Sequence, residues 1–230
     1  IDEVRLENEC GEAARAEGAL RYFGGDLREK LTIANLLSAT IDAFDKVDIL
    51  VNASRLFAVS DPLDPASDAV ELMLQYNLIS ALRLTQMTAK RMISQAEKAG
   101  ATGAIGAIIN LSSTAASRPQ PELLGYAISS AAVEQMTRSM ALALAPRGIR
   151  VNAVAFGSVM SASLQVQLKE NPDFRTAILD GTPLNRIAAP AELAETVQFL
   201  ASDASGFMTG QVVTLDGGRS LQDAVRAPAF

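Results

Sequence analysis

A serine and a tyrosine are spaced so that both could act on one carbonyl oxygen. Ser113 closely follows the apolar run at residues 106–111, and Tyr126 comes thirteen residues later. A serine at the end of a buried strand can donate a hydrogen bond to a carbonyl oxygen, and a tyrosine at a helix start can exchange a proton with it. An unassisted phenol titrates at about 10, so such a tyrosine normally needs a cation one helical turn further on. Ser130 occupies that position and carries no charge.

Short apolar runs alternate with amphipathic stretches of helical length, which is typical of a parallel sheet covered by helices. We expect strands over residues 19–23, 47–52, 106–111, 150–155 and 211–215. We expect helices over residues 4–17, 31–44, 70–93 and 123–145, and another that starts at Pro190. The predicted fold is α/β, a Rossmann-like doubly wound parallel sheet with helices on both faces, in one domain over residues 1–230.

The beginning of the chain is unusual for this fold. It opens with an expected helix, residues 4–17, and has no strand before it. The glycine-rich turn that binds phosphate in such folds belongs to an earlier βα unit, and no Gly-x-Gly-x-x-Gly cluster occurs near the start. Because a sheet without its middle strands would expose apolar faces, we expect that a preceding βα segment is missing from the sequence. The alternative is a protein that dispenses with this segment.

The composition argues against several classes of function. The net charge of −6 disfavours nucleic-acid binding, which usually requires a basic face. No apolar run approaches the roughly 18 residues of a membrane span, and the first residues lack the apolar core of a signal peptide. With no histidine and a single cysteine, Cys10, we expect no metal site and no histidine-based triad. We therefore expect a cytoplasmic protein with no nucleic-acid or membrane partner.

Several motifs follow one another in a recognisable order. Residues 47–54 read Val-Asp-Ile-Leu-Val-Asn-Ala-Ser, residues 150–157 read Arg-Val-Asn-Ala-Val-Ala-Phe-Gly, and residues 209–218 end in Asp-Gly-Gly. Together with Ser113 and Tyr126, they make the chain resemble the short-chain dehydrogenase/reductase family, particularly its 3-oxoacyl-acyl-carrier-protein-reductase-like branch. The resemblance runs from Ile1 to about Gly218.

The resemblance implies that NAD or NADP binds along the ends of the strands. Asp26 matches the carboxylate that meets the adenine amine, although it is also suited to cap the helix that follows. Asp2 lies near the position that would repel a 2′-phosphate, which favours NAD. The residues that the resemblance places at the cofactor are Asp26, Leu27, Asn52, Ala53, Ser54, Tyr126, Phe156, Gly157, Val159 and Ser161.

The resemblance also implies the reaction. A hydride moves between nicotinamide and the carbonyl carbon of a small-molecule substrate, while Tyr126 exchanges the proton on oxygen and Ser113 holds that oxygen. The alternative for Ser113 is that it only caps the turn after its strand. Asn77 matches the asparagine that holds a proton-relay water, and its alternative is a buried amide satisfied by backbone. In the family, a lysine at the position of Ser130 bonds the nicotinamide ribose and lowers the tyrosine pKa.

Three departures from the family pattern fall on one pocket. Ser130 cannot supply the positive charge, so oxidation near neutral pH should suffer most. Phe156 replaces a proline and adds bulk. The strand-end motif lacks its last glycine, a residue that lets backbone approach the cofactor closely. Aligned without a gap, Arg55 takes the place of this glycine, and with one deletion Ser54 does. Arg118, in the loop before Tyr126, is a candidate for the missing charge, and its alternative is a solvated loop arginine.

Three hypotheses about function follow. The first is an NAD(P)-dependent oxidoreductase of small carbonyls or alcohols, with a 3-oxoacyl-like substrate as one candidate. The second is a catalytically lapsed member that acts as a nucleotide-binding regulator or scaffold, and the third is a structural subunit without a ligand. The resemblance implies a homodimer or homotetramer formed through the helices at residues 70–93 and 123–145. Residues 158–188, the expected lid, carry few charges and indicate a moderately apolar substrate.

Overall fold

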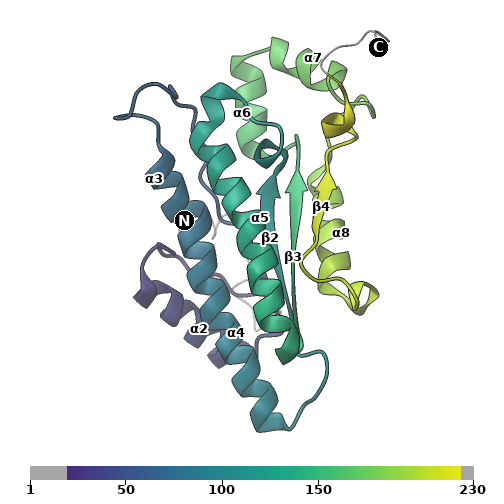
Figure 1. Ribbon diagram of the computed structural model, residues 1–230. Coiled ribbons are helices and arrows are strands. Elements are labelled where there is room, and N and C mark those ends of the chain that lie inside the picture. The colour runs from purple at the N-terminus through teal and green to yellow at the C-terminus, as the bar shows by residue number, and fades with distance from the viewer. Residues whose placement is uncertain (1–19, 224–230) are drawn as a thin grey trace.

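The computed structural model describes residues 20–223, which are built around a sheet of four parallel strands (Figure 1). The strands lie in sequence order and are β1 (Ile49–Asn52), β2 (Gly106–Ser113), β3 (Ile149–Phe156) and β4 (Val212–Leu215). The register places Asn52 opposite Asn110 and Ser113 opposite Phe156. Because the strands are parallel, their carboxyl ends share one edge, where open α/β sheets bind their ligands.

Helices cover both faces of the sheet, as predicted. α4 (Ser80–Ala99) and α5 (Leu124–Leu144) pack on one face, and α8 (Pro190–Ala201) packs on the other. α6 (Ala162–Glu170) and α7 (Asp173–Asp180) lie beyond the carboxyl ends of the strands (Figure 1). α2 (Lys30–Phe44), before β1, packs against α4. None of the helices within residues 20–223 has the length and apolar character that crossing a membrane would require.

The two central strands explain why this part of the fold was readable from sequence. Neighbouring residues of β2 point to opposite faces, where Ile108 joins the cluster under α4 and α5 and Ile109 joins the cluster under α8. On β3, Val151 and Val154 divide between the same two clusters. A strand buried on both faces must be apolar at nearly every position, which gives a continuous run rather than an alternation.

Buried polar side chains tie the sheet to its helices. Asn52 on β1 donates to Thr85 on α4 (2.9 Å) and to Asn110 on β2 (2.7 Å). Asn110 in turn donates to Thr137 on α5 (2.8 Å). These groups are buried, and each hydrogen bond offsets the cost of removing an amide or hydroxyl from water. The network fixes the end of β1 against the two helices that carry the candidate site.

The expected single helix over residues 70–93 is wrong in one respect. It is divided into α3 (Val70–Met73), a π-helical turn (Leu74–Ile79) and α4. The apolar period continues through the wide turn, so sequence periodicity does not reveal it. Single π-helical turns occur often at functional sites, and this one carries Asn77.

The strand expected over residues 19–23 is also not observed, as far as these residues are described. Residues 20–23 have an irregular conformation and pair with none of the four strands. A strand forms only where a neighbour completes its hydrogen bonds, and apolar composition alone does not supply that neighbour. On the outer strand β1, Ile49 and Val51 are 50% and 40% exposed. The expected helix at residues 4–17, and Asp2, lie outside the described residues.

The start of α8 depends on an ionised glutamate. The Glu192 carboxylate accepts from the Ala189 backbone N–H (2.8 Å) and pairs with Arg186 (2.6 Å). The hydrogen bonds from Arg186, with a smaller contribution from the backbone, lower the pKa of Glu192 to about 2. A pKa below the unfolded value of 4.5 means that the ionised carboxylate stabilises the fold above pH 4.5, and that this contribution is lost as the pH falls through about 2.

We therefore predict that Glu192→Gln lowers the thermal unfolding midpoint at pH 7. The difference from wild type should shrink below pH 4.5 and disappear as the pH falls below about 2, because the protonated Glu192 is then uncharged, like the glutamine of the variant. Thermal unfolding measured across this range checks the prediction. A difference that stays the same at every pH would contradict the assigned role of the charge.

Candidate active site

A cavity of about 2350 Å³ opens at the carboxyl ends of the strands. Its walls come from the loops after β1, β2 and β3 and from the α6–α7 segment. The predicted site residues that line it are Asp26, Leu27, Ala53, Ser54, Ser113, Tyr126, Phe156, Gly157, Val159 and Ser161. A small adjoining cavity is lined by the remaining predicted residues, Asn52, Asn77 and Ser130. The structure thus brings all the predicted site residues to two neighbouring cavities.

Ser113 and Tyr126 face the same large cavity. Ser113 is the last residue of β2, and its Oγ accepts from the Ala115 N–H (3.2 Å), so the capping alternative describes part of its geometry. Tyr126 lies in the first turn of α5, where its ring meets the Phe57 ring edge-to-face with centroids 5.1 Å apart. Both residues are more than nine-tenths buried, although they line the cavity.

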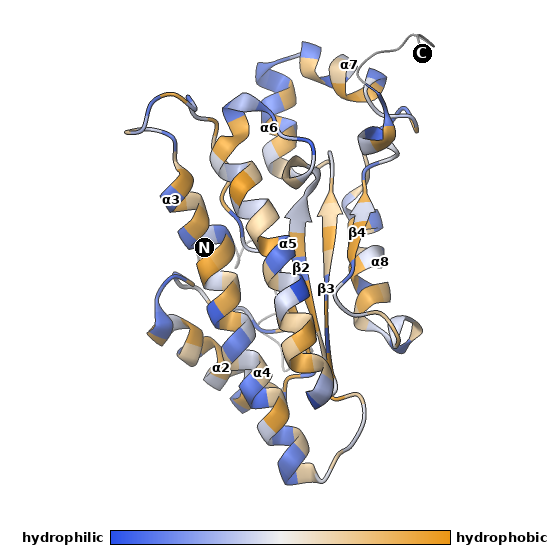
Figure 2. Ribbon diagram, viewed as in Figure 1, coloured by the Kyte–Doolittle hydropathy of each residue, from blue (hydrophilic) through white to orange (hydrophobic). Residues whose placement is uncertain are grey.

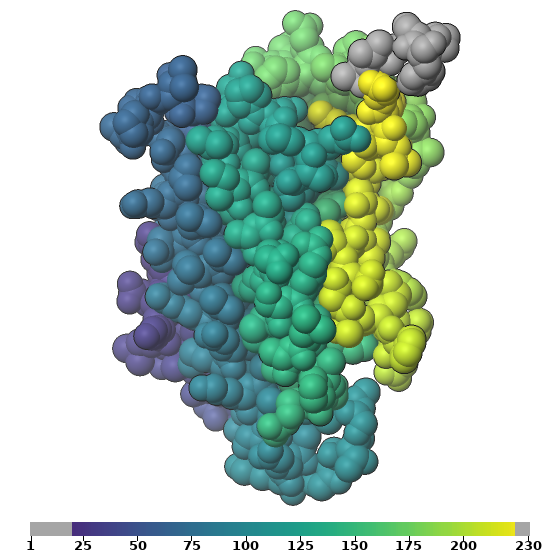
Figure 3. Space-filling model, viewed as in Figure 1, coloured from purple at the N-terminus to yellow at the C-terminus, as the bar shows by residue number. Residues whose placement is uncertain are grey.

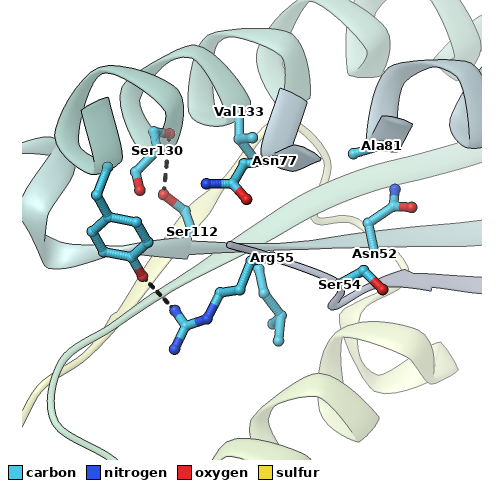
Figure 4. A pocket seen from close by; sticks show the side chains of 10 residues that line it. Asn52, Ser54, Arg55, Asn77, Ala81, Ser112, Ser130 and Val133 are labelled. Atoms are coloured by element: carbon cyan, nitrogen blue, oxygen red, sulfur yellow. Dashed lines mark hydrogen bonds between the residues drawn. The ribbon is translucent and has the colours of Figure 1, made fainter. Parts of the chain in front are cut away.

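Arg55 binds the phenol oxygen of Tyr126. It belongs to the loop that follows β1, and its Nη1 donates to Tyr126 Oη at 2.5 Å (Figure 4). The guanidinium carbon lies 4.2 Å from the Phe156 ring centroid, a distance typical of a cation–π contact. The sequence indicated Arg55 only as a residue that stands in the place of a glycine. No local spacing pointed to this contact, because the two residues are 71 positions apart.

Asn77 fixes the loop that carries Arg55. Its Oδ1 accepts from the Leu56 N–H (2.6 Å), and its Nδ2 donates to the Leu56 carbonyl (3.0 Å) and to Ser129 Oγ (3.0 Å). The side chain therefore matches the alternative of a buried amide satisfied by backbone. The proton-relay water stays a prediction. The π-helical turn thus brings this amide into hydrogen-bond contact with the residue directly after Arg55.

Ser130 lies one helical turn after Tyr126 and is 5% exposed. It shares the small cavity with Arg55 and Tyr126 (Figure 4). Ser112 Oγ contacts the Ser130 carbonyl oxygen (3.2 Å) and the Glu134 carboxylate (3.1 Å). Position 130, where the resemblance implies a lysine, thus holds a small buried side chain that lines the same cavity as Arg55.

Asp26 forms a close pair with its neighbour Arg28. The Arg28 side chain donates to both carboxylate oxygens at 2.5–3.0 Å, and its own N–H donates to Oδ1 (2.9 Å). These hydrogen bonds, those of the side chain first, lower the pKa of Asp26 to about 2. Arg28 also lies over the Tyr76 ring, 4.2 Å from its centroid. Asp26 therefore closes the turn before α2, whereas the residue at the helix N-cap is Glu29.

The segment after β3 forms another wall of the large cavity. The Gly157 N–H donates to the Leu215 carbonyl (2.9 Å), and a Cβ added at Gly157 would lie only 3.1 Å from the Cβ of Asp216. Val159 is buried, and Ser161 caps α6 by accepting from the Leu164 N–H (3.2 Å). A larger residue at position 157 would thus push the turn away from β4, which explains a glycine there independently of any ligand.

Arg118, the other candidate for the missing charge, is turned elsewhere. Its Nε donates to the Ser220 carbonyl (3.0 Å), and its Nη2 donates to the same oxygen. In the space-filling view the loop after β2 meets the C-terminal segment at this place (Figure 3). Arg118 therefore joins two parts of the rim rather than acting on Tyr126.

Searches among known proteins agree on one family. A family model described as enoyl-(acyl carrier protein) reductase matches residues 1–220. The 3-oxoacyl-[acyl-carrier-protein] reductase FabG of Thermotoga maritima is 30% identical over 218 residues, which are 95% of this chain and 84% of that protein. Galactitol 2-dehydrogenase (L-tagatose-forming) of Cereibacter sphaeroides is 35% identical over 218 residues, with 91% and 83% covered.

A solved structure supports the fold as well. A gluconate 5-dehydrogenase from Burkholderia cenocepacia, in complex with NADP and tartrate, has a TM-score of 0.82 at 25% identity and covers 96% of this chain and 84% of its own. The predicted Rossmann-like α/β fold is therefore confirmed. The matching proteins are reductases and dehydrogenases, and the match covers most of the length of each. The chain belongs to the short-chain dehydrogenase/reductase family and is, like these relatives, an oxidoreductase.

Proposed function

We propose that the protein transfers a hydride between NAD or NADP and a small carbonyl or alcohol substrate. The observation that carries this proposal is that Ser113 and Tyr126 line one cavity at the carboxyl ends of parallel strands. A hydroxyl acid–base group and a hydroxyl hydrogen-bond donor around one space suit a carbonyl oxygen between them. Nicotinamide, when bound, supplies or accepts the hydride.

The residues of the chain have distinct roles in this proposal. Ser113 Oγ donates a hydrogen bond to the substrate oxygen and so orients the carbonyl. Tyr126 Oη gives its proton to that oxygen during reduction and takes it back during oxidation. Asn77 positions the loop after β1 through the Leu56 backbone. Ser130 leaves the position of the family lysine uncharged, so the positive charge at Tyr126 has to come from elsewhere.

The cavity fits a dinucleotide and a substrate together. Its volume of about 2350 Å³ is larger than the roughly 300–1,000 Å³ of a typical small-ligand site. Asp26 and Leu27 line the end nearest α2, and we assign the adenine to this end. Gly157, Val159 and Ser161 line the end after β3, and we assign the carboxamide to it. Asn52, at the end of β1, lines the small adjoining cavity, and its side chain is engaged in the buried network.

The comparisons leave both nicotinamide cofactors as candidates. The gluconate 5-dehydrogenase was solved with NADP, whereas the reason to favour NAD was Asp2, outside the described residues. The substrate wall mixes apolar side chains such as Leu164 and Phe174 with polar ones such as Gln167 and Asn171. We therefore propose a small carbonyl or alcohol, and include 3-oxoacyl thioesters and polyols as the two substrate classes to test.

We also propose a homodimer or homotetramer formed through α4 and α5. Figure 2 shows apolar residues along both helices on the face turned to the viewer. On α5, Leu142 is 81% exposed and Ile128 is 41% exposed. Burying such side chains against a second copy of the protein would remove apolar surface from contact with water, which favours association. A cytoplasmic location stays a prediction from composition.

Replacing Leu142 by Asp should lower the mass of the particle in solution. A charge at the centre of an apolar interface opposes association, so light scattering should detect a smaller assembly than for wild type. Leu63→Asp is the matched control and should leave the mass unchanged, because Leu63 is 89% exposed in the loop between β1 and α3 and belongs to neither helix. A monomeric wild-type protein would refute the proposed assembly.

Replacing Tyr126 by Phe should lower kcat by about 100-fold or more, because the side chain that exchanges the proton is lost. The measurement is nicotinamide absorbance with each cofactor and both substrate classes. Binding of cofactor, followed as a rise in thermal stability, should persist in this variant. Tyr22→Phe, outside the residues that line the cavity, is the control. Equal rates for Tyr126→Phe and wild type would exclude the proposed role, and bound cofactor without any turnover would favour a lapsed, nucleotide-binding protein.

A further inference from the structure

We infer that Arg55 is the cation that acts on Tyr126 in place of a lysine at position 130. This inference rests on the proposed function and identifies the charged group that this active site uses. The direct observation is the 2.5 Å hydrogen bond from Arg55 Nη1 to Tyr126 Oη. A hydrogen bond from a guanidinium becomes stronger when its acceptor oxygen is negative, so Arg55 favours the ionised phenol.

Two contacts hold the guanidinium at the phenol oxygen. The Phe156 ring lies 4.2 Å from its central carbon and gives it a flat surface to stack on. The backbone of the next residue, Leu56, is clamped on both its N–H and its carbonyl by the buried Asn77 amide. A long arginine side chain loses entropy when it is fixed, and these contacts provide part of the compensation.

The three departures from the family pattern are explained together if the positive charge at Tyr126 has moved from position 130 to Arg55. Arg55, in the place of a glycine, brings the charge. Phe156, in the place of a proline, brings the aromatic surface beneath it. Ser130 lines the same small cavity as Arg55, so a lysine at that position would bring a second positive charge close to the guanidinium. A small neutral residue at position 130 is what the new cation requires.

Other charged groups around the cavity are engaged elsewhere or on its rim. Arg28 is paired with Asp26, Arg118 donates to the Ser220 carbonyl, and Arg219 donates to Ser158 Oγ (3.2 Å). On α5, two helical turns after Tyr126, Glu134 pairs with Arg138 at 3.6 Å. The remaining acidic residues lining the cavity are Glu122, Glu170 and Asp223.

The proton balance of the step is simple. During reduction the O–H bond of Tyr126 breaks, and its proton forms a bond to the substrate oxygen as the carbonyl carbon gains the hydride. The negative charge left on the phenol oxygen lies against Arg55, which keeps all its own protons. During oxidation the same oxygen takes the alcohol proton. Arg55 thus matters most for oxidation, in which Tyr126 must begin ionised.

The test compares Arg55→Met, Arg55→Lys and the double variant Arg55→Met with Ser130→Lys. Arg55→Met should lower kcat for oxidation by about 100-fold and move the rising limb of the pH–rate profile to higher pH. Arg55→Lys, which keeps a charge but loses the planar fork, should retain an intermediate rate. The double variant should recover at least about tenfold over Arg55→Met, because a lysine then reaches Tyr126 from one turn along α5.

Two results would overturn the inference. An Arg55→Met rate equal to or above that of wild type would mean that the side chain obstructs the nicotinamide end. A lower rate with an unmoved pH profile and no recovery in the double variant would mean that Arg55 only packs. Either result leaves the role of Tyr126 as proton donor open to its own separate test.

A measurement without cofactor distinguishes this inference from the proposed function. Ultraviolet absorbance of tyrosinate, with the signal of Tyr126→Phe subtracted, follows the ionisation of Tyr126 alone. Arg55→Met should move this ionisation to higher pH, and Arg118→Met should leave it in place. If wild type turns over no substrate but the shift is seen, the inference stands and the proposed function fails. If no shift is seen, the inference fails.

Discussion

The hydrogen bond between Arg55 and Tyr126 is the interaction on which the rest of the site depends. It joins the loop after β1 to the first turn of α5 and places a positive charge at the phenol oxygen that we propose as the proton donor. A phenol is a weak acid, so a tyrosine can act as a base near neutral pH only where its anion is stabilised. The neighbouring residues are arranged around this need. Phe156 stacks beneath the guanidinium, and Asn77 holds the backbone beside it.

The sheet and its buried network supply the rigidity that this contact requires. Asn52 and Asn110 lie opposite each other on neighbouring strands, and their hydrogen bonds reach Thr85 on α4 and Thr137 on α5. The end of β1 is thereby fixed relative to α5 just before the chain enters the loop with Arg55. A site held to within a fraction of an ångström needs such support, because small displacements weaken a charged hydrogen bond strongly. The scaffold that the protein shares with its family therefore also positions Arg55.

The central strands and most helices were predictable from sequence, whereas the contact of the Arg55 guanidinium with Tyr126 was not. Mostly apolar runs at residues 106–111 and 150–155, interrupted by Asn110 and Asn152, predicted the two strands that are buried on both faces. The spacing of Ser113 and Tyr126 predicted their shared cavity. The contact between Arg55 and Tyr126 could not be predicted from helical spacing, because such spacing relates only residues on one helix and these two are 71 positions apart. The π-helical turn could not be predicted because the apolar pattern continues through it. Residues 20–23 form no strand, although their composition is suited to one.

A crystal structure of the full protein with oxidised cofactor and an alcohol substrate tests the central claim most directly. We predict that the Arg55 guanidinium remains in hydrogen-bond contact with the Tyr126 oxygen while the alcohol oxygen lies between Tyr126 and Ser113. An Arg55 side chain that has swung away into solvent, with Tyr126 contacted by a different cation or by none, would contradict it.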